Sequence, residues 1–350
     1  MISQIKVIAT IPVGRRPSDI ALNKRTNLLY VPSNGSDTVS VISARTNRVI
    51  ATIEGNEGAI SVAINPRTNQ IYVAGLSGKL FIINGKKNKL THTFDVGGGF
   101  ASLAVNVKTN KVYAVNLDRN SVTVLNGNKK KIVATISVGM QRPSVASPHT
   151  IVANPFTNRI YVLNPGEDTA TVIKGSTDRV MSTIKVGQGP FSLVINLRTN
   201  RLYIALEEKG SVAVINGRTN KRITTIPNVG DIDMLAVNPI TNRVYAPDDT
   251  TNSVKVTVIS GKTNTIIATI QNGESPRIPV VNPKLNRIYI ATSGEETPTS
   301  LASVINGRNN KILKSNLRIG RGASAGCFNE SNNRVYFTNE EGDTVTVLSG

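Results

Sequence analysis

The sequence is poor in several residue types that enzymes and small secreted proteins depend on. Among its 350 residues it has no tryptophan, one cysteine (Cys327) and two histidines (His92 and His149). One cysteine excludes a disulfide within the chain. Two histidines that recur nowhere leave little for a histidine-ligated metal or a nucleophile–histidine–acid triad. We therefore expect no metal site and no bound cofactor, and we expect binding rather than catalysis.

Long apolar runs are also missing. No run is long enough to span a bilayer, and the first residues lack the charged and apolar segments of a secretory signal. No linker or low-complexity tail divides the chain. We expect one closed domain over residues 1–350, a monomer, and no membrane insertion.

One pattern, Asn-x3-Asn-x2-Tyr, accounts for all eight tyrosines and recurs at intervals of 41 to 48 residues. A period in the low forties, built from short β-like runs, is typical of a β-propeller. Asparagine tolerates positive φ, so we interpret the asparagines as turn residues. We interpret the tyrosines as space-filling strand residues rather than a ligand-stacking ring. They are Tyr30, Tyr72, Tyr113, Tyr161, Tyr203, Tyr245, Tyr289 and Tyr336.

Each repeat contains four short strands. In the first repeat these are residues 20–22, 28–31, 38–42 and 49–53, separated by Asn-, Gly-, Asp- and Ser-rich turns. The last repeat stops after its third strand, and residues 5–11 supply a strand of the fourth type ahead of the first repeat. The N-terminal strand should therefore complete the last repeat and remove the free sheet edges. The predicted fold is all-β: an eight-bladed β-propeller of four-stranded antiparallel blades.

The turn motif carries a family resemblance. Asn65–Val73 and Asn154–Val162 read Asn-Pro-x-Thr-Asn-x-Ile-Tyr-Val, with close variants at Asn196–Ile204 and Asn238–Ala246. This element resembles the YVTN family of β-propeller repeats. The resemblance implies a surface-layer, secreted or periplasmic protein of a prokaryote, and it brings over no catalytic motif and no site residues. Propellers of this family commonly have seven blades, whereas the eight copies here predict eight.

The formal net charge of +19 is sorted by side. Turns after the first and third strands of a meander lie on one side of the ring, which we call the turn face. These turns carry more than two thirds of the lysines and arginines. We expect this face to dock a polyanion, such as a cell-wall polymer, an acidic glycan or nucleic acid; the alternative is that the charge only keeps the protein soluble. The candidate polyanion-binding residues are Arg25, Arg48, Lys86, Lys87, Lys129, Lys130, Lys131, Arg201, Lys221, Arg222 and Lys311.

The opposite side, which we call the loop face, carries the loops after the second and fourth strands and most of the acidic residues. Loops on a rigid scaffold often hold functional residues, and those after the fourth strand surround the mouth of the central channel. Arginines among carboxylates there would hold an anionic ligand or pair with their acidic neighbours. The candidate channel-mouth residues are Arg16, Arg142, His149, Phe191, Asp231, Asp233, Arg277 and Arg321.

These observations predict a non-catalytic binding or scaffold propeller at a cell surface or in a secreted complex, with a polyanion or another protein as partner. Two alternatives stay open. One is a protein that binds polyanions or single-stranded nucleic acid as its main function. The other is a small-molecule lyase or lactone hydrolase with its site at the channel mouth.

Overall fold

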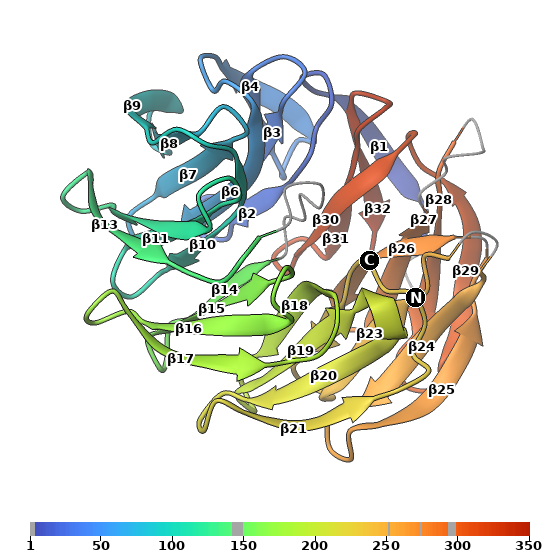
Figure 1. Cartoon of the computed structure of the whole chain (residues 1–350). Helices are drawn as coiled ribbons and strands as arrows, with labels where there is room; N and C mark the ends of the chain where they lie inside the picture. Colours follow the sequence, from blue (N-terminus) through green and yellow to red (C-terminus); the bar gives the residue numbers. More distant parts are fainter. Residues whose placement is uncertain (1–3, 142–149, 251–252, 274, 293–298) are drawn as a thin grey trace.

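The computed structural model describes residues 4–141, 150–250, 253–273, 275–292 and 299–350 and shows an all-β protein (Figure 1). Its strands form eight four-stranded antiparallel sheets, arranged as the blades of a ring. The eight-bladed β-propeller predicted from the sequence is confirmed. Within the described residues the one helical element is a 3-10 turn, η1 (Glu207–Lys209), and no helix is long and apolar enough to cross a membrane.

The first four blades follow one another along the chain. Blade 1 consists of β2 (Ala21–Asn23), β3 (Leu28–Ser33), β4 (Thr38–Ser43) and β5 (Arg48–Ile53). Blade 2 consists of β6 (Ala59–Asn65), β7 (Gln70–Gly75), β8 (Lys79–Asn84) and β9 (Lys89–Asp95). Blade 3 consists of β10 (Phe100–Asn106), β11 (Lys111–Asn116), β12 (Ser121–Asn126) and β13 (Lys131–Ser137). Blade 4 consists of β14 (Ile151–Asn154), β15 (Arg159–Asn164), β16 (Thr169–Lys174) and β17 (Arg179–Lys185).

The remaining blades complete the ring. Blade 5 consists of β18 (Pro190–Asn196), β19 (Arg201–Leu206), β20 (Ser211–Asn216) and β21 (Lys221–Ile226). Blade 6 consists of β22 (Ala236–Asn238), β23 (Arg243–Pro247), β24 (Lys255–Ser260) and β25 (Thr265–Gln271). Blade 7 consists of β26 (Pro276–Asn282), β27 (Arg287–Thr292), β28 (Leu301–Asn306) and β29 (Lys311–Arg318). Blade 8 consists of β30 (Ala323–Asn329), β31 (Arg334–Asn339), β32 (Thr344–Ser349) and β1 (Val7–Pro12).

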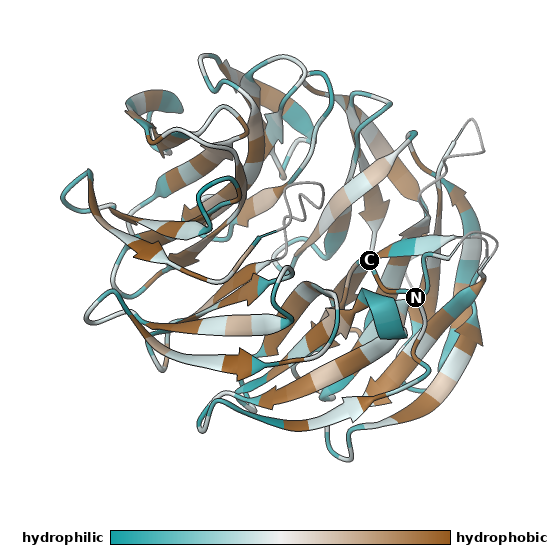
Figure 2. Cartoon of the chain, in the orientation of Figure 1, coloured by the Kyte–Doolittle hydropathy of each residue, from teal (hydrophilic) through white to brown (hydrophobic). Residues whose placement is uncertain are grey.

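We name the strands of each blade a to d in that order. The a strands of neighbouring blades contact one another around the central channel, and the d strands form the rim (Figure 1). Burial follows from this arrangement. The b and c strands, such as β3 and β4, are buried along almost their whole length, whereas the d strand β5 alternates between exposed and covered residues. Apolar residues accordingly dominate the strands and hydrophilic residues the turns (Figure 2).

The core lies between blades. One apolar cluster joins Tyr161 and Val172 of blade 4 to Leu193 and Ile204 of blade 5, and equivalent clusters fill the other junctions. All eight tyrosines are fully buried, which confirms the prediction that they fill space between blades. Each blade is thus stabilised by apolar contacts with its neighbours as well as by its own sheet.

The N-terminal strand closes the ring. β1 pairs antiparallel with β32, with Thr10 opposite Thr346 and Ile11 opposite Val345. The predicted strand, residues 5–11, begins two residues too early and ends one residue too early relative to Val7–Pro12. The backbone N–H of Ser349 donates to the carbonyl oxygen of Lys6 at 2.9 Å, so the two ends of the chain meet. Blade 8 therefore has the same four strands as the other blades.

Candidate functional site

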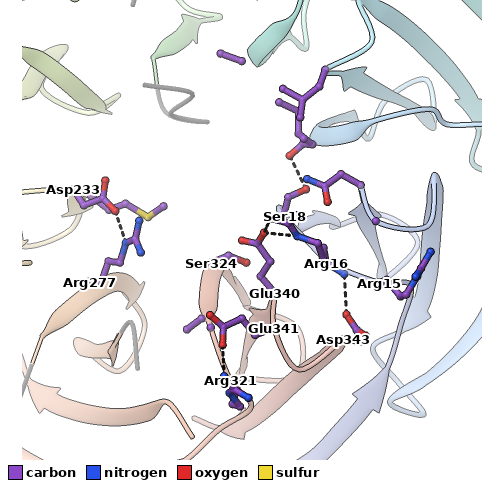
Figure 3. Close-up of a pocket in the computed structure, with 18 of the residues that line it drawn as sticks. Arg15, Arg16, Ser18, Asp233, Arg277, Arg321, Ser324, Glu340, Glu341 and Asp343 are labelled. Carbon is purple, nitrogen blue, oxygen red and sulfur yellow. Dashed lines mark hydrogen bonds and ion pairs between the residues drawn. The ribbon is translucent and has the colours of Figure 1, made fainter. Parts of the chain in front are cut away.

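A cavity of about 1100 Å³ opens on the loop face (Figure 3). Residues from blades 1, 2, 3, 5, 6, 7 and 8 line it, so it lies at the mouth of the channel. The d–a segment before β2 and the b–c loop before β32 provide most of its charged wall. The charged and polar lining residues are Arg15, Arg16, Ser18, Asn34, Asp233, Arg277, Arg321, Ser324, Glu340, Glu341 and Asp343.

The structure brings together most of the predicted channel-mouth residues. Arg16, Phe191, Asp233, Arg277 and Arg321 all line the large cavity. Asp231 lines a smaller recess of about 120 Å³ that shares Phe191, Asp233 and Arg277 with it. Arg142 and His149 lie outside the described residues.

Two of these residues were expected in loops and lie instead in strands. Phe191 is the second residue of β18, and Arg277 is the second residue of β26. Both a strands extend further toward the loop face than the a strand of the first repeat suggested. Near its start each has a shift in register relative to the b strand, and pairing resumes on the far side of that shift.

The arginines of the cavity are paired with acidic side chains. Arg16 donates through Nη2 to Oε1 of Glu340 at 2.9 Å, and its backbone N–H donates to Oδ1 of Asp343 at 2.8 Å. Nη2 of Arg321 lies 2.9 Å from Oε2 of Glu341. Figure 3 shows these pairs on one side of the opening.

Arg277 stands on the other side of the opening. Its Nε pairs with Oδ2 of Asp233 (Figure 3) and also lies 3.5 Å from Oδ2 of Asp249. Of the two roles predicted for the channel-mouth arginines, pairing with acidic neighbours therefore describes Arg16, Arg277 and Arg321.

Carboxyl groups accumulate beside Arg277. Partial burial raises the pKa of Asp231, and repulsion from Asp248 and Asp233 raises it further. The backbone N–H of Asp231 donates to Oδ1 of Asp248 at 3.2 Å, which holds the two residues together. The wall formed by blade 6 is thus acidic, whereas basic and acidic groups alternate on the wall formed by blades 8 and 1.

The sequence did not indicate which acidic loop meets which arginine. Glu340, Glu341 and Asp343 come from the b–c loop of blade 8, and they face arginines of the d–a segments on either side of that blade. Arg15, beside them, has no side-chain hydrogen bond or ion pair to any residue that the structure describes. Only the assembled ring brings these segments together, so motif spacing carries no signal for them.

The turn face contains an arrangement that the sequence analysis missed. The first Asn of each motif donates through Nδ2 to Oδ1 of the second Asn in the next blade, at 2.6 to 2.9 Å. In the order of the blades the pairs are Asn23–Asn69, Asn65–Asn110, Asn106–Asn158, Asn154–Asn200, Asn196–Asn242, Asn238–Asn286, Asn282–Asn333 and Asn329–Asn27. We call this ring of hydrogen bonds the asparagine clamp.

Several basic residues of the turn face belong to the same junctions. In most blades the residue after the second Asn reaches the c–d turn of the next blade, as Arg334 does by donating to the carbonyl oxygen of Ala44 and Oδ1 of Asn47, both at 3.1 Å. Arg201, a predicted polyanion-binding residue, donates in the same way to the carbonyl oxygen of Gly261 and to Oδ1 of Asn264 at 3.2 Å. The charge of these residues contributes to the face, but their guanidinium groups already have protein partners.

Most of the other predicted polyanion-binding residues are free. Arg25 and Arg222 each donate to one backbone carbonyl, of Arg67 and Val186 respectively. The others are exposed, and their side chains have no partner among the residues described: Arg48, Lys86, Lys87, Lys129, Lys130, Lys131, Lys221 and Lys311. On this face Asp178 is paired with Lys111 at 2.6 Å, which leaves Glu330 as the exposed acid of the a–b turns. The face is therefore strongly basic.

Groups suited to nucleophilic or metal chemistry are scarce in the described part of the chain. No cluster of three His, Cys, Asp or Glu side chains there is placed to hold a metal ion. His92 lies in the d strand β9 with its ring stacked on Phe94, at 6.3 Å between centroids. Burial raises the pKa of the Cys327 thiol in β30, so it stays protonated at neutral pH.

Comparisons with known proteins identify the architecture. No protein-family model and no curated protein sequence matches the chain. Among solved structures it is similar to a chain of Kuenenia stuttgartiensis hydrazine synthase, with a TM-score of 0.64 and 17% sequence identity. The match covers 84% of this chain and 96% of that chain. This likeness shows a shared propeller fold, and the resemblance to the YVTN family stays a prediction.

Proposed function

We propose that the protein is a non-catalytic binding module that docks a polyanion through its turn face. One observation carries the proposal: exposed basic side chains that have no partner among the described residues follow the a–b and c–d turns around the ring. Because few acids oppose them there, the face attracts anions over its whole width.

The distribution of the charge favours a polymer over a small anion. A small ligand needs several cations converging on one point, whereas Lys86, Lys87 and Lys129–Lys131 lie on the turns of successive blades. An extended chain of negative charges contacts many such turns at once and releases counterions from each.

We propose an acidic glycan or a cell-wall polymer as the physiological partner, at a cell surface or in a secreted complex. Recognition of single-stranded nucleic acid usually adds aromatic side chains on which bases stack. On the turn face Phe156 is exposed but lies under the Nζ of Lys108, 4.8 Å from the ring centroid. The sparse aromatics support a glycan over nucleic acid.

The test is binding to heparin, single-stranded DNA and an uncharged glycan over a salt series. We expect both polyanions to bind and the uncharged glycan not to bind, with affinity falling steeply as salt rises. Replacing Lys86, Lys87, Lys129, Lys130 and Lys131 by Glu should weaken heparin binding by at least about tenfold, because five contacts become repulsive.

A matched control reverses the same number of charges on the other side. Arg119, Lys185, Lys209, Lys255 and Arg318 are exposed and lie toward the loop face. Their replacement by Glu changes the net charge equally and should lower heparin affinity much less. Equal losses in both variants, or no polyanion binding near physiological salt, would contradict the proposal.

The cavity of about 1100 Å³ favours a second candidate, a small-molecule site at the channel mouth. Its volume suits a drug-sized ligand, and Ser18, Arg15 and Ser324 offer polar groups to one. A lyase or lactone hydrolase would use this site. The pairing of its arginines with carboxylates favours a binding site over a catalytic one.

A further inference from the structure

Four large apolar side chains project from the turn face. Phe156 is 68% exposed, Ile240 58%, Leu197 40% and Leu285 39%. Each belongs to an a–b turn, and the four turns are those of the consecutive blades 4, 5, 6 and 7. We call these four residues the apolar arc.

The asparagine clamp makes the arc continuous. Asn154 bonds Asn200 at 2.9 Å, Asn196 bonds Asn242 at 2.7 Å, and Asn238 bonds Asn286 at 2.8 Å. Hydrogen bonds therefore join the four turns to one another in the order of the blades. Their apolar side chains follow one half of the channel opening on the turn face, and the clamp holds the turns that carry them.

Repetition of the blade does not explain the arc. The corresponding turns of blades 8, 1, 2 and 3 carry polar or charged residues at their exposed positions, namely Glu330, Ser331, Lys24, Arg25, Arg67, Thr68 and Lys108. Blade 8 has Ser331 at the position that Phe156 and Ile240 occupy in their own turns. An asymmetry in an otherwise repeated unit points to a function of that half of the face.

Basic residues surround the arc. Arg198 and Lys284 are exposed in the same turns, and Lys108 stands over the ring of Phe156. The exposed c–d turn residues Lys174, Arg218, Lys262 and Arg308 of the same four blades lie outside them. The surface thus combines projecting apolar side chains with a surrounding belt of positive charge.

We propose that the apolar arc docks on an anionic lipid bilayer. Apolar side chains flanked by Lys and Arg suit the boundary between headgroups and acyl chains, where the apolar groups enter and the cations meet anionic headgroups. An amphipathic protein segment docks its apolar face in a groove. The arc projects from turn tips, and both cavities described above open on the opposite face.

The inference rests on the proposed function for the basic face, and it adds a requirement for apolar contact that charge alone does not supply. The test is co-flotation with vesicles of phosphatidylcholine containing phosphatidylglycerol, and with vesicles of phosphatidylcholine alone, at low and high salt. The arc variant is Phe156→Ser with Ile240→Ser, which introduces the residue that blade 8 already has at that position. The control is Ile50→Thr with Ile267→Thr, two exposed side chains of the rim strands β5 and β25.

We expect the unaltered protein to bind the anionic vesicles, with part of the binding surviving high salt, and to bind neutral vesicles weakly. The arc variant should lose at least about tenfold in affinity for anionic vesicles, together with the salt-resistant part. The rim control should bind as the unaltered protein does, and thermal unfolding of both variants verifies that they fold.

Heparin separates this inference from the proposed function. The arc variant should keep its heparin affinity, because it retains every basic residue. Heparin binding without vesicle binding, or vesicle binding that the arc variant leaves intact, would overturn the inference and leave the polyanion proposal standing. If the unaltered protein does not bind heparin, the polyanion proposal itself is overturned.

Discussion

The tyrosine ring of each repeat fills the space between two sheets. In several repeats the tyrosine hydroxyl also reaches the c–d turn of the next blade. Tyr30 donates to Oδ1 of Asn88 at 2.9 Å, and Tyr161 donates to the carbonyl oxygen of Gly217 at 3.0 Å. The sequence predicted the ring's position from β-propensity and repetition, but the hydroxyl's partner lies in a different repeat and could not be predicted.

Burial raises the pKa of all eight tyrosines, that of Tyr30 to about 12. A folded-state pKa above the unfolded value of 10.0 means that the folded state holds the proton more tightly. The tyrosines' contribution to stability is therefore complete below pH 10 and declines as pH rises from 10 through the folded-state value.

Absorbance of tyrosinate at 295 nm during an alkaline titration checks this prediction. We expect almost no tyrosinate at pH 10.5, followed by a single rise that coincides with loss of the β-sheet circular dichroism signal. The chain unfolded in urea should titrate near pH 10. Ionisation of several tyrosines around pH 10 in a chain that keeps its sheet signal would show that they are not buried.

At the scale of the element, the two asparagines of each a–b turn do two things. They stabilise the backbone of their own turn, and they bond the a–b turns of the neighbouring blades. The second Asn has positive φ throughout, from 51° to 58°, as the turn chemistry predicted. The first Asn accepts from a backbone N–H of its own turn, as Asn196 does from Arg198 at 3.0 Å, and donates to the next blade. The donation joins residues such as Asn23 and Asn69, 46 positions apart, so local sequence carries no sign of it.

We predict that Asn196→Ala lowers the free energy of unfolding by about 1–3 kcal/mol, because it leaves a turn N–H and Oδ1 of Asn242 without their partner. Asn216→Ala is the matched control. Among the residues described, the side chain of Asn216 bonds only within its own c–d turn, where Oδ1 accepts from the backbone N–H groups of Arg218 and Thr219 at 2.9 and 3.2 Å. Urea unfolding at constant m-value measures both, and equal losses would mean that the clamp between blades adds nothing to the turn.

The channel mouth shows where prediction from the sequence stopped. Residue type and loop position identified Arg16, Asp233, Arg277 and Arg321 as neighbours of the channel. Their partners were out of reach, since Arg16 and Glu340 lie 324 positions apart and meet only after the ring closes. Phe191 and Arg277 were expected in loops because strand ends are poorly marked where a register shift lengthens the strand.

At the scale of the whole molecule, the ring depends on one short strand. β1 supplies Ile11 and Ile8 to the apolar cluster between blades 8 and 1, and it covers the edge of β32. Its place was predictable because the last repeat stops one strand short and the N-terminal residues read as the missing strand. The family resemblance alone would have suggested seven blades, so the number came from counting the repeat.

We predict that removing residues 1–12 lowers the melting temperature by roughly 10 °C or more, because blade 8 loses its fourth strand and the closing junction loses the buried side chain of Ile11. The truncated protein should also associate as its concentration rises, since β32 then presents an unpaired edge. Calorimetry and light scattering measure the two effects. A peptide of residues 4–13 added to the truncated protein should restore both properties, and an unaltered, monomeric truncated protein would show that closure does not depend on β1.

The uniform sense of the asparagine clamp has a consequence for how such a molecule changes over generations. Every blade carries one donor and one acceptor, and the closing link from Asn329 to Asn27 is made like the other seven. Duplication or deletion of a whole blade adds or removes a donor and an acceptor together, so no link is orphaned. The packing angle between neighbouring sheets, rather than the clamp, therefore sets the number of blades. A gene of this kind can gain or lose a whole repeat and still encode a ring in which every clamp bond is made.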